Sequence, residues 1–264
     1  MRWFPVALTA SLALALTFLT LPVVAIFLNS SPGDLLDSLG DPVARDALWL
    51  SVRCTAAALA IILVVGTPAA YLLATRSFRG KALAVTLIEL PLVLPPAVAG
   101  IALLASVGPS GLLGGAIDAA GIQLSLATAG VVVALTFVAS PFYVRQAMAA
   151  FASVDRTLLD ASRTLGVSEA RGFARVTIPT AMPGLVAGGA LALGRALGEF
   201  GATLMFAGSF RGITQTAPLA IYDTFATDFD SALALSAVLV AVSGAILLSV
   251  KLVHGGEVLG GAPR

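Results

Sequence analysis

The sequence predicts an all-α membrane protein with six transmembrane helices, and both its composition and its long apolar runs indicate this fold class. Of the 264 residues, 58% are apolar and 11% are charged, whereas soluble domains average about 45–50% and about 25%. The mean hydropathy is +1.00. So little charge cannot cover the surface of a soluble enzyme, and so apolar a chain is not disordered. A net charge of +1 without a basic stripe also excludes a nucleic-acid-binding protein.

Six apolar stretches are long enough to cross a bilayer. Each holds about 20 residues or more, which spans a hydrocarbon core of about 30 Å. A signal peptide is the alternative for the first stretch, because Arg2 precedes it. That apolar run is longer than the about 7–15 residues of a signal peptide, and no A-x-A site follows, so a retained span is favoured. We expect helices near residues 4–28, 47–74, 83–107, 123–145, 183–207 and 231–253.

The charges of the connecting loops predict the orientation of the chain. The loops at 75–82 and 145–182 are basic, whereas those at 29–46, 108–122 and 208–230 are acidic. The two kinds alternate strictly along the chain, and basic loops face the cytoplasm. We therefore expect a multi-pass protein of the cytoplasmic (inner) membrane, embedded in the lipid bilayer, with both termini in the cytoplasm.

Several kinds of chemistry are missing from the sequence. Cys54 is the only cysteine and His254 the only histidine, which excludes an intrachain disulfide and the usual cysteine or histidine metal sites. The two lysines, Lys81 and Lys251, lie outside any G-x-x-x-x-G-K-[ST] pattern, so the chain has no phosphate-binding P-loop. If ATP drives this protein, another chain hydrolyses it.

The 145–182 loop is too long for a simple connector, and its pattern predicts two short helices. Asp155 suits the N-cap of the first helix, which ends at Gly166. Ser168 suits the N-cap of the second, which has Glu169 in its first turn and ends before Pro179. Helices this short need a surface to pack on. Either they lie on the membrane with arginines on lipid phosphates, or they dock into a groove of a cytoplasmic partner.

The same loop carries a resemblance to a known family. Asp160-Ala161-Ser162, then Gly166, then Val176-Thr177-Ile178-Pro179 resemble the EAA loop of permease subunits in binding-protein-dependent ABC importers. That pattern is E-A-A, three residues, G, nine residues, I-x-L-P. The spacing matches without a gap, and the four departures are conservative in size or charge. The resemblance implies that the loop docks on an ATPase through Asp160, Ala161, Ser162, Gly166, Val176, Ile178 and Pro179.

The resemblance extends over nearly the whole chain. Its most specific part is the run Gly194-Arg195-Ala196-Leu197-Gly198-Glu199-Phe200-Gly201-Ala202-Thr203, and residues 91–100, 141–145, 206–208 and 214–222 also match. These segments resemble molybdate permeases more than sulfate/thiosulfate permeases, and they also resemble tungstate permeases. The resemblance therefore implies inward transport of a tetrahedral oxyanion. Molybdate is the favoured substrate, and sulfate, thiosulfate and tungstate are the alternatives.

The resemblance also implies a fold and a set of partners. The fold is that of type I ABC importer permeases, with one transmembrane domain over 1–264 and a cytoplasmic coupling loop at about 146–181. The partners are a second copy of the chain, two cytoplasmic ABC ATPase subunits and an extracytoplasmic oxyanion-binding protein. ATP and magnesium would bind to the ATPase, so this chain is a transport subunit without a cofactor or an enzymatic activity of its own.

Charged residues and prolines within the spans are candidates for a translocation pathway. Arg195 and Glu199 lie four residues apart, so they share a helix face, and each is costly in lipid. One interpretation is an ion pair that locks the fifth span against a neighbour. The other is that Arg195 binds an oxyanion in the pathway while Glu199 offsets the positive charge of Arg195, so that the anion can be released. Pro95 and Pro96 loosen the third span, which then lines a gate or is simply bent.

Other features of the spans have structural interpretations. Glu89, in the third span, suits a partnership with a cytoplasmic arginine such as Arg76 or Arg79, unless it belongs to the pathway. Arg53 is expected to snorkel to the headgroups. Two G-x-x-x-G pairs in the fifth span, Gly184/Gly188 and Gly194/Gly198, suit tight helix packing or a dimer seam.

Two other functions match isolated features of the sequence. Gly108-Pro109-Ser110-Gly111 fits the G-x-S-G of intramembrane serine proteases, but Ser110 and His254 are predicted on opposite sides of a core of about 30 Å. A secondary transporter could carry protons on Glu89 or Glu199. It would leave the long coupling-like loop without a purpose, and the halves show no inverted repeat.

Overall fold

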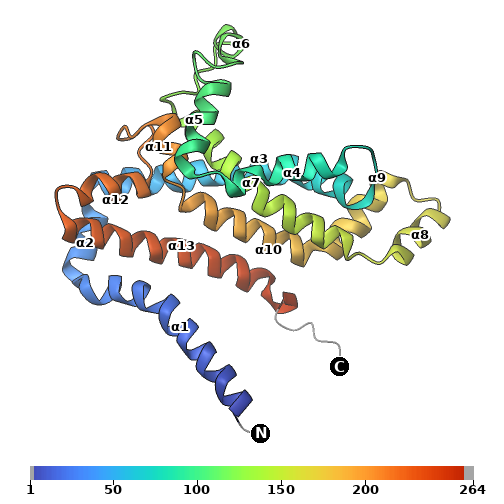
Figure 1. The fold of residues 1–264 in the computed structure, drawn as a ribbon, viewed down its shortest axis with the longest axis horizontal. Coiled ribbons are helices and arrows are strands. Elements are labelled where there is room, and N and C mark those ends of the chain that lie inside the picture. Colours follow the sequence, from blue (N-terminus) through green and yellow to red (C-terminus); the bar gives the residue numbers. More distant parts are fainter. Residues whose placement is uncertain (1–2, 259–264) are drawn as a thin grey trace.

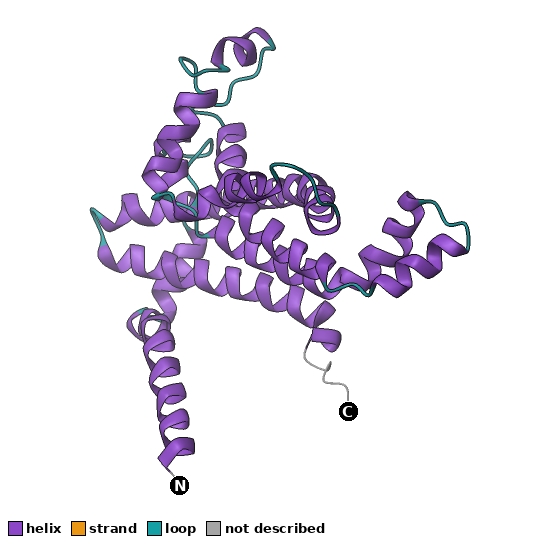
Figure 2. Cartoon of the chain, turned by 45° about the vertical axis from the view of Figure 1, so that its right-hand side comes forward, coloured by secondary structure: helices purple, strands orange, loops and turns teal. Residues whose placement is uncertain are grey.

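The computed structural model describes residues 3–258, and this part of the chain contains helices and no strand (Figures 1 and 2). Five helical stretches are long and apolar enough to cross a membrane, and a shorter apolar helix, α5, accompanies them. The elements are α1 (Trp3–Asn29), α2 (Pro32–Gly40), α3 (Pro42–Thr75), α4 (Lys81–Val93), α5 (Pro96–Val107), α6 (Gly114–Ala119), α7 (Thr128–Ala152), α8 (Arg156–Thr164), α9 (Glu169–Gly172), the π-helical turn η1 (Phe173–Thr177), α10 (Ile178–Leu197), α11 (Gly201–Ala207), α12 (Ala217–Phe225) and α13 (Phe229–Val258).

The third predicted span, 83–107, is two helices and not one. α4 ends at Val93 and α5 begins at Pro96. Leu94 has an extended backbone, with φ −73° and ψ 131°, as residues before proline prefer. Pro95 and Pro96 follow in succession and supply no N–H donor to the preceding turn. The prediction of one continuous helix was therefore wrong, because two adjacent prolines end a helix that one proline would only bend.

The fifth predicted span, 183–207, starts earlier and is interrupted near its end. The helical path from Glu169 to Leu197 is continuous over 29 residues, so the prediction that a loop helix ends before Pro179 was wrong. The π-helical turn η1 directly precedes α10, and we attribute the tolerance of Pro179 to this wider turn. The path then breaks at Gly198–Phe200 before α11 begins.

Two other spans have boundaries that differ from the prediction. α3 begins at Pro42 and not near 47, because the Asp41 carboxylate accepts hydrogen bonds from the N–H groups of Val43 (3.1 Å) and Ala44 (3.3 Å), which caps the helix. α7 covers 128–152 where 123–145 was expected. Arg145, assigned to the loop in the prediction, therefore lies inside a helix.

The core forms where α7 packs between α3 and α10. Glycines allow this close approach: a Cβ on Gly184 would lie 2.4 Å from the Cβ of Ala150, and one on Gly188 would lie 3.0 Å from the Cβ of Gln146. The tight-packing interpretation of this pair is confirmed. A Cβ on Gly194 would meet nothing within 4 Å, so the second pair does not serve the same purpose within one chain.

Two parts of the chain project from this core in both views (Figures 1 and 2). α1 diverges from the other long helices, and none of its residues is buried. α5 and α6 extend away from the bundle on another side. Along the bundle, α8 and α9 lie at one end, and α2 and α12 lie at the opposite end (Figure 1). The candidate site residues fall into two regions of this frame.

Candidate functional site

The first region is the α8–α9 segment (residues 156–172), and short-range hydrogen bonds set its shape. The Asp155 Oδ1 accepts a hydrogen bond from the Thr157 N–H at 2.8 Å, which confirms the predicted cap, and this bond lowers the pKa of the Asp155 carboxyl below its ordinary value. Gly166 has a φ of +74°, the left-handed conformation that ends helices. Ser168 precedes α9 in an extended conformation, but its side chain makes no capping hydrogen bond.

The predicted docking residues fall into two groups, of which only the first lies within this segment. Asp160, Ala161 and Ser162 lie in α8, and Gly166 lies in the turn that follows; the side chain of Ala161 is outside the described part of the structure. Ser162 bonds back to the carbonyl of Leu159 at 2.8 Å, and its carbonyl accepts the N–H of Val167 at 3.0 Å.

The second group continues into the long helix. Val176 lies in η1, and Ile178 and Pro179 open α10. Ile178 is half-buried and packs on the main core, whereas Pro179 is exposed. The two ends of the predicted motif therefore differ: the α8 end protrudes, and the α10 end is fixed to the bundle.

A cleft separates α8 from the ends of two membrane helices. Its volume is about 370 Å³, and it lies between α8, the start of α9 and the ends of α3 and α7. Two of its lining residues are aromatic: Tyr71 contacts Phe173 in a tilted arrangement with ring centroids 4.5 Å apart, and it meets Phe151 edge-on at 5.5 Å. Beside these rings, the guanidinium of Arg76 bonds to the carboxylate of Glu169. Sequence reasoning missed this ion pair, because the two residues lie 93 positions apart.

The second region is the break in the fifth span, where Arg195 and Glu199 meet. The Arg195 guanidinium donates to Glu199 Oε2 at 2.5 Å, and the Ala202 N–H donates to Oε1 at 2.7 Å. The Glu199 side chain is 1% exposed and that of Arg195 is 27% exposed. The ion pair that one interpretation expected is present, and among the described residues its hydrogen-bond partners all lie in the fifth span. It bridges the end of α10 and the first turn of α11 within the same span.

The breaks in the third and fifth spans are joined by direct packing of α5 on α11. A Cβ on Gly201 would lie 2.6 Å from the Cβ of Pro96, and one on Gly100 would lie 2.6 Å from the Cβ of Met205. The two half-helices therefore approach so closely that neither glycine can be replaced without a shift of backbone. Pro95 and Pro96 thus sit at a joint between two broken spans.

Glu89 pairs with an arginine, as expected, but not with either of the two that served as examples. Its Oε1 lies 3.7 Å from the Nε of Arg145 in α7, and not beside Arg76 or Arg79. The reason is the length of α7, which carries Arg145 alongside α4. Arg53 lies on the exposed side of α3, as expected for a snorkelling residue.

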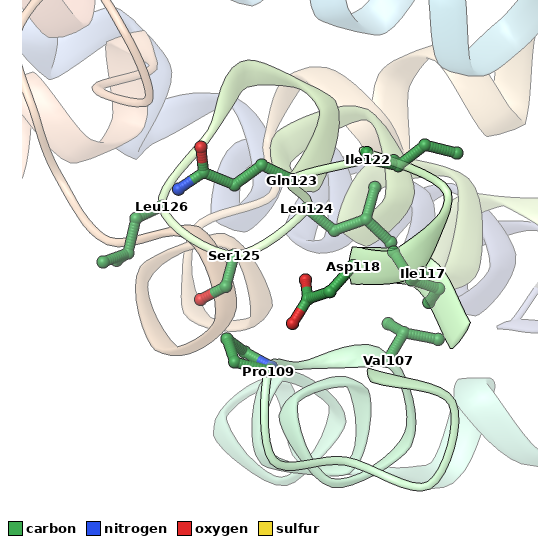
Figure 3. Close-up of a pocket in the computed structure, with 10 residues that line it drawn as sticks. Val107, Pro109, Ile117, Asp118, Ile122, Gln123, Leu124, Ser125 and Leu126 are labelled. Atoms are coloured by element: carbon green, nitrogen blue, oxygen red, sulfur yellow. The ribbon is translucent and has the colours of Figure 1, made fainter. Parts of the chain in front are cut away.

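A further cavity lies where α5 and α6 meet the loop that precedes α7 (Figure 3). It measures about 420 Å³, and the side chains of Asp118 and Ser125 point toward it. Its ten lining residues include this carboxylate and no basic side chain, which does not suit an anion. The cavity was not foreseen, because the sequence marked this loop only as acidic.

Comparison with known proteins gives consistent matches over most of the chain. Residues 66–254 match the family model described as "Binding-protein-dependent transport system inner membrane component". The molybdenum transport system permease protein ModB of Mycobacterium tuberculosis is 42% identical over 235 residues, which cover 89% of each chain. The sulfate transport system permease protein CysW of Escherichia coli is 34% identical over 83% of this chain and 76% of that one.

Solved structures share the fold. A bacterial ABC transporter that imports the acidic polysaccharide alginate matches with a TM-score of 0.76 and 16% identity, over 96% of this chain and 95% of that one. The inward-facing MetNI methionine ABC transporter matches with a TM-score of 0.63 and 19% identity, over 81% and 95%. The expected permease fold is therefore confirmed, with five long apolar helices and the shorter apolar helix α5. The chain belongs to the family of inner membrane components of binding-protein-dependent transport systems.

Proposed function

We propose that this chain is the permease subunit of an ATP-driven importer that moves molybdate inward across the cytoplasmic membrane. The observation that carries the proposal is the similarity to molybdenum permeases, at 42% identity over 89% of both chains. The sulfate relative is similar at 34%, so sulfate or thiosulfate is the second candidate. Tungstate is a tetrahedral oxyanion of the same charge, and it remains an alternative substrate of the same site.

The α8–α9 segment is the proposed docking element for a cytoplasmic ATPase. Asp160 and Gly166 are exposed at the end of the bundle, while the aromatic rings of Tyr71, Phe151 and Phe173 hold the base of the segment. A protruding short helix on a fixed base suits insertion into a groove of a partner. In this proposal two ATPase subunits bind ATP and magnesium, and the basic loops and both termini face the cytoplasm.

The proposed assembly contains two copies of this chain and an extracytoplasmic oxyanion-binding protein. The free surface of α1 supports the second copy: the helix is 27 residues long, and none of them is buried. α5 and α11 belong to the half of the chain that would face the binding protein. A pathway between two copies would place their broken spans opposite each other.

Arg195 is the proposed cation of the pathway. Its guanidinium remains 27% exposed beside a Glu199 carboxylate that is almost completely buried. The exposed part of the guanidinium can donate to an oxyanion, while Glu199 keeps one donor occupied and offsets the positive charge. Binding is then weak enough for release, which conduction requires. Pro95, Pro96 and Glu89 are the remaining pathway candidates, the first two through the joint between α5 and α11.

Uptake by proteoliposomes tests the proposal. The vesicles contain this chain, its ATPase and its binding protein, and they are given labelled molybdate with and without ATP and with excess sulfate or tungstate. We expect uptake that requires ATP and that sulfate does not suppress. Suppression by sulfate would assign the chain to the sulfate group. Uptake driven by a proton gradient without ATP would contradict the proposal and favour a secondary transporter.

A further inference from the structure

We infer that the Arg76–Glu169 ion pair is a positioning contact that ties movement of the α8–α9 segment to the membrane helix α3. The inference rests on the proposed function, since it concerns how an ATPase bound at α8 would act on the spans. Arg76 directly follows the last residue of α3, and its N–H still bonds to the carbonyl of Leu72 at 3.0 Å. Glu169 is the first residue of α9. Their side chains therefore connect two helix ends.

The segment has one covalent connection to the spans on its C-terminal side. From Glu169 the helix continues through η1 and α10 as far as Leu197, which carries it to the Arg195–Glu199 bridge. Any displacement of α9 along this rod reaches the break in the fifth span. The rod is not uniform, because η1 is a π-helical turn, and such turns mark functional positions in helices. A segment held only by the rod could pivot at η1.

Other contacts at the base do not fix the direction of such a pivot. The contacting rings of Tyr71, Phe151 and Phe173 link α3, α7 and η1, but apolar contacts are non-directional. The cleft of about 370 Å³ separates α8 from the ends of α3 and α7, so packing does not hold α8 there. The Arg76–Glu169 contact lies at the edge of this cleft, and hydrogen bonding between charged groups is directional.

The exposure of the pair separates a coupling role from a stabilising one. The Arg76 and Glu169 side chains are 56% and 57% exposed, and ion pairs in water contribute little to folding stability. Loss of the pair should therefore leave a folded chain. It should instead uncouple α3 from the segment, so that ATP is hydrolysed with less transport.

The test compares single variants, an exchange and a matched control in the same proteoliposomes. The variants are Arg76→Ala, Glu169→Ala and the exchange of Arg76→Glu with Glu169→Arg. Arg79→Ala is the control, because Arg79 lies in the same exposed turn and forms no ion pair within the described residues. The measured quantity is molybdate transported per ATP hydrolysed, together with the thermal unfolding midpoint of each complex.

We expect each single variant to lower the ratio by about fivefold, the largest effect that an exposed ion pair can supply, with ATP hydrolysis retained and the midpoint unchanged. The exchange should recover most of the ratio, and Arg79→Ala should match the wild type. Single variants that match Arg79→Ala would overturn the inference. So would an exchange that stays as uncoupled as the single variants, because the residues would then act separately. Absence of ATP-dependent uptake by the wild type would instead overturn the proposed function, and the inference with it.

Discussion

Two Arg–Glu pairs of this chain have the same chemistry and opposite surroundings. Arg195–Glu199 lies at the break in the fifth span, with the carboxylate 1% exposed, whereas Arg76–Glu169 lies at the end of the bundle, with both side chains more than half exposed. A buried carboxylate that loses its partner is strongly unfavourable. An exposed one is resolvated by water, and the pair is worth about 0–1 kcal/mol.

The difference in exposure indicates whether an ion pair stabilises the fold or takes part in a conformational change. The buried pair also holds the Ala202 N–H, so it fixes the angle between α10 and α11 in every state in which it persists. The exposed pair joins residues of different helices across a cleft and can break and reform at little cost. One continuous helical path, Glu169–Leu197, connects the two pairs. We expect substitutions near the break to affect folding and transport, and those at the α8–α9 segment to affect coupling.

The largest effect is expected from Glu199→Ala. The change removes the acceptor of both the Arg195 guanidinium and the Ala202 N–H, and breaking a buried ion pair costs about 3–5 kcal/mol. Because Arg195 is partly exposed, the loss should fall near the lower end of that range. Thermal unfolding of the detergent-solubilised chain measures it. Glu199→Gln is the matched control, since it keeps an oxygen for the Ala202 N–H; equal stability of wild type and Glu199→Ala would contradict a structural bridge.

Arg195→Ala sharpens the comparison, since it separates the transport role of the buried pair from its structural role. A charge-assisted hydrogen bond contributes about 1.5–3 kcal/mol, and a loss of about 1.4 kcal/mol weakens binding tenfold. Molybdate uptake per assembled dimer should therefore fall about tenfold or more. The change also leaves the buried Glu199 carboxylate without its cation, so a loss of stability should accompany the loss of uptake. Arg195→Lys, which keeps the charge, should retain part of the uptake. If Arg195→Ala instead yields no folded protein, the residue serves structure and not the pathway.

How far the sequence could predict these regions depends on the range of the interactions. The ends of α8 were predicted correctly from Asp155 and Gly166, because an N-cap and a left-handed glycine act within one helical turn. The break at Gly198–Phe200 was missed, because it interrupts an apolar run without any proline. No local sequence signal distinguishes Gly198, which ends α10, from the glycines that only allow close helix packing.

Long-range pairings were the least predictable part of the candidate site. Glu89 was expected to pair with a cytoplasmic arginine, with Arg76 and Arg79 as examples, whereas its partner is Arg145 of α7. Arg76 pairs instead with Glu169, 93 residues away. Such contacts depend on how far each helix extends and on which faces meet. The resemblance supplied the family and the docking motif, but the pairing of charges came only from the fold.

Gly166→Asp is expected to have a smaller effect on the chain and a selective effect on its partner. The left-handed conformation at φ +74° costs a non-glycine residue about 1–2 kcal/mol, with aspartate among the best tolerated. A Cβ there meets nothing within 4 Å, so the chain should still insert while the added carboxylate disturbs ATPase docking. Co-purification of the ATPase measures this. Gly121→Asp, also at positive φ (+72°) and in open space, should retain the ATPase; equal retention by both variants would remove Gly166 from the docking surface.

The smallest effect is the pH dependence of the α8 cap. The Thr157 N–H lowers the pKa of Asp155 below its ordinary value of 3.8, so the carboxylate form is favoured when α8 is folded. This stabilisation is complete above pH 3.8 and is lost as the pH falls through the lowered pKa. The protection factors of the α8 amides, which are exchange rates corrected for the intrinsic effect of pH, should therefore show no change between neutral pH and about pH 5 and faster opening only in stronger acid. Asp155→Asn keeps a neutral capping oxygen and should abolish the acid-dependent step. If opening of α8 in the wild type accelerates between pH 7 and pH 5, a group other than Asp155 controls the segment.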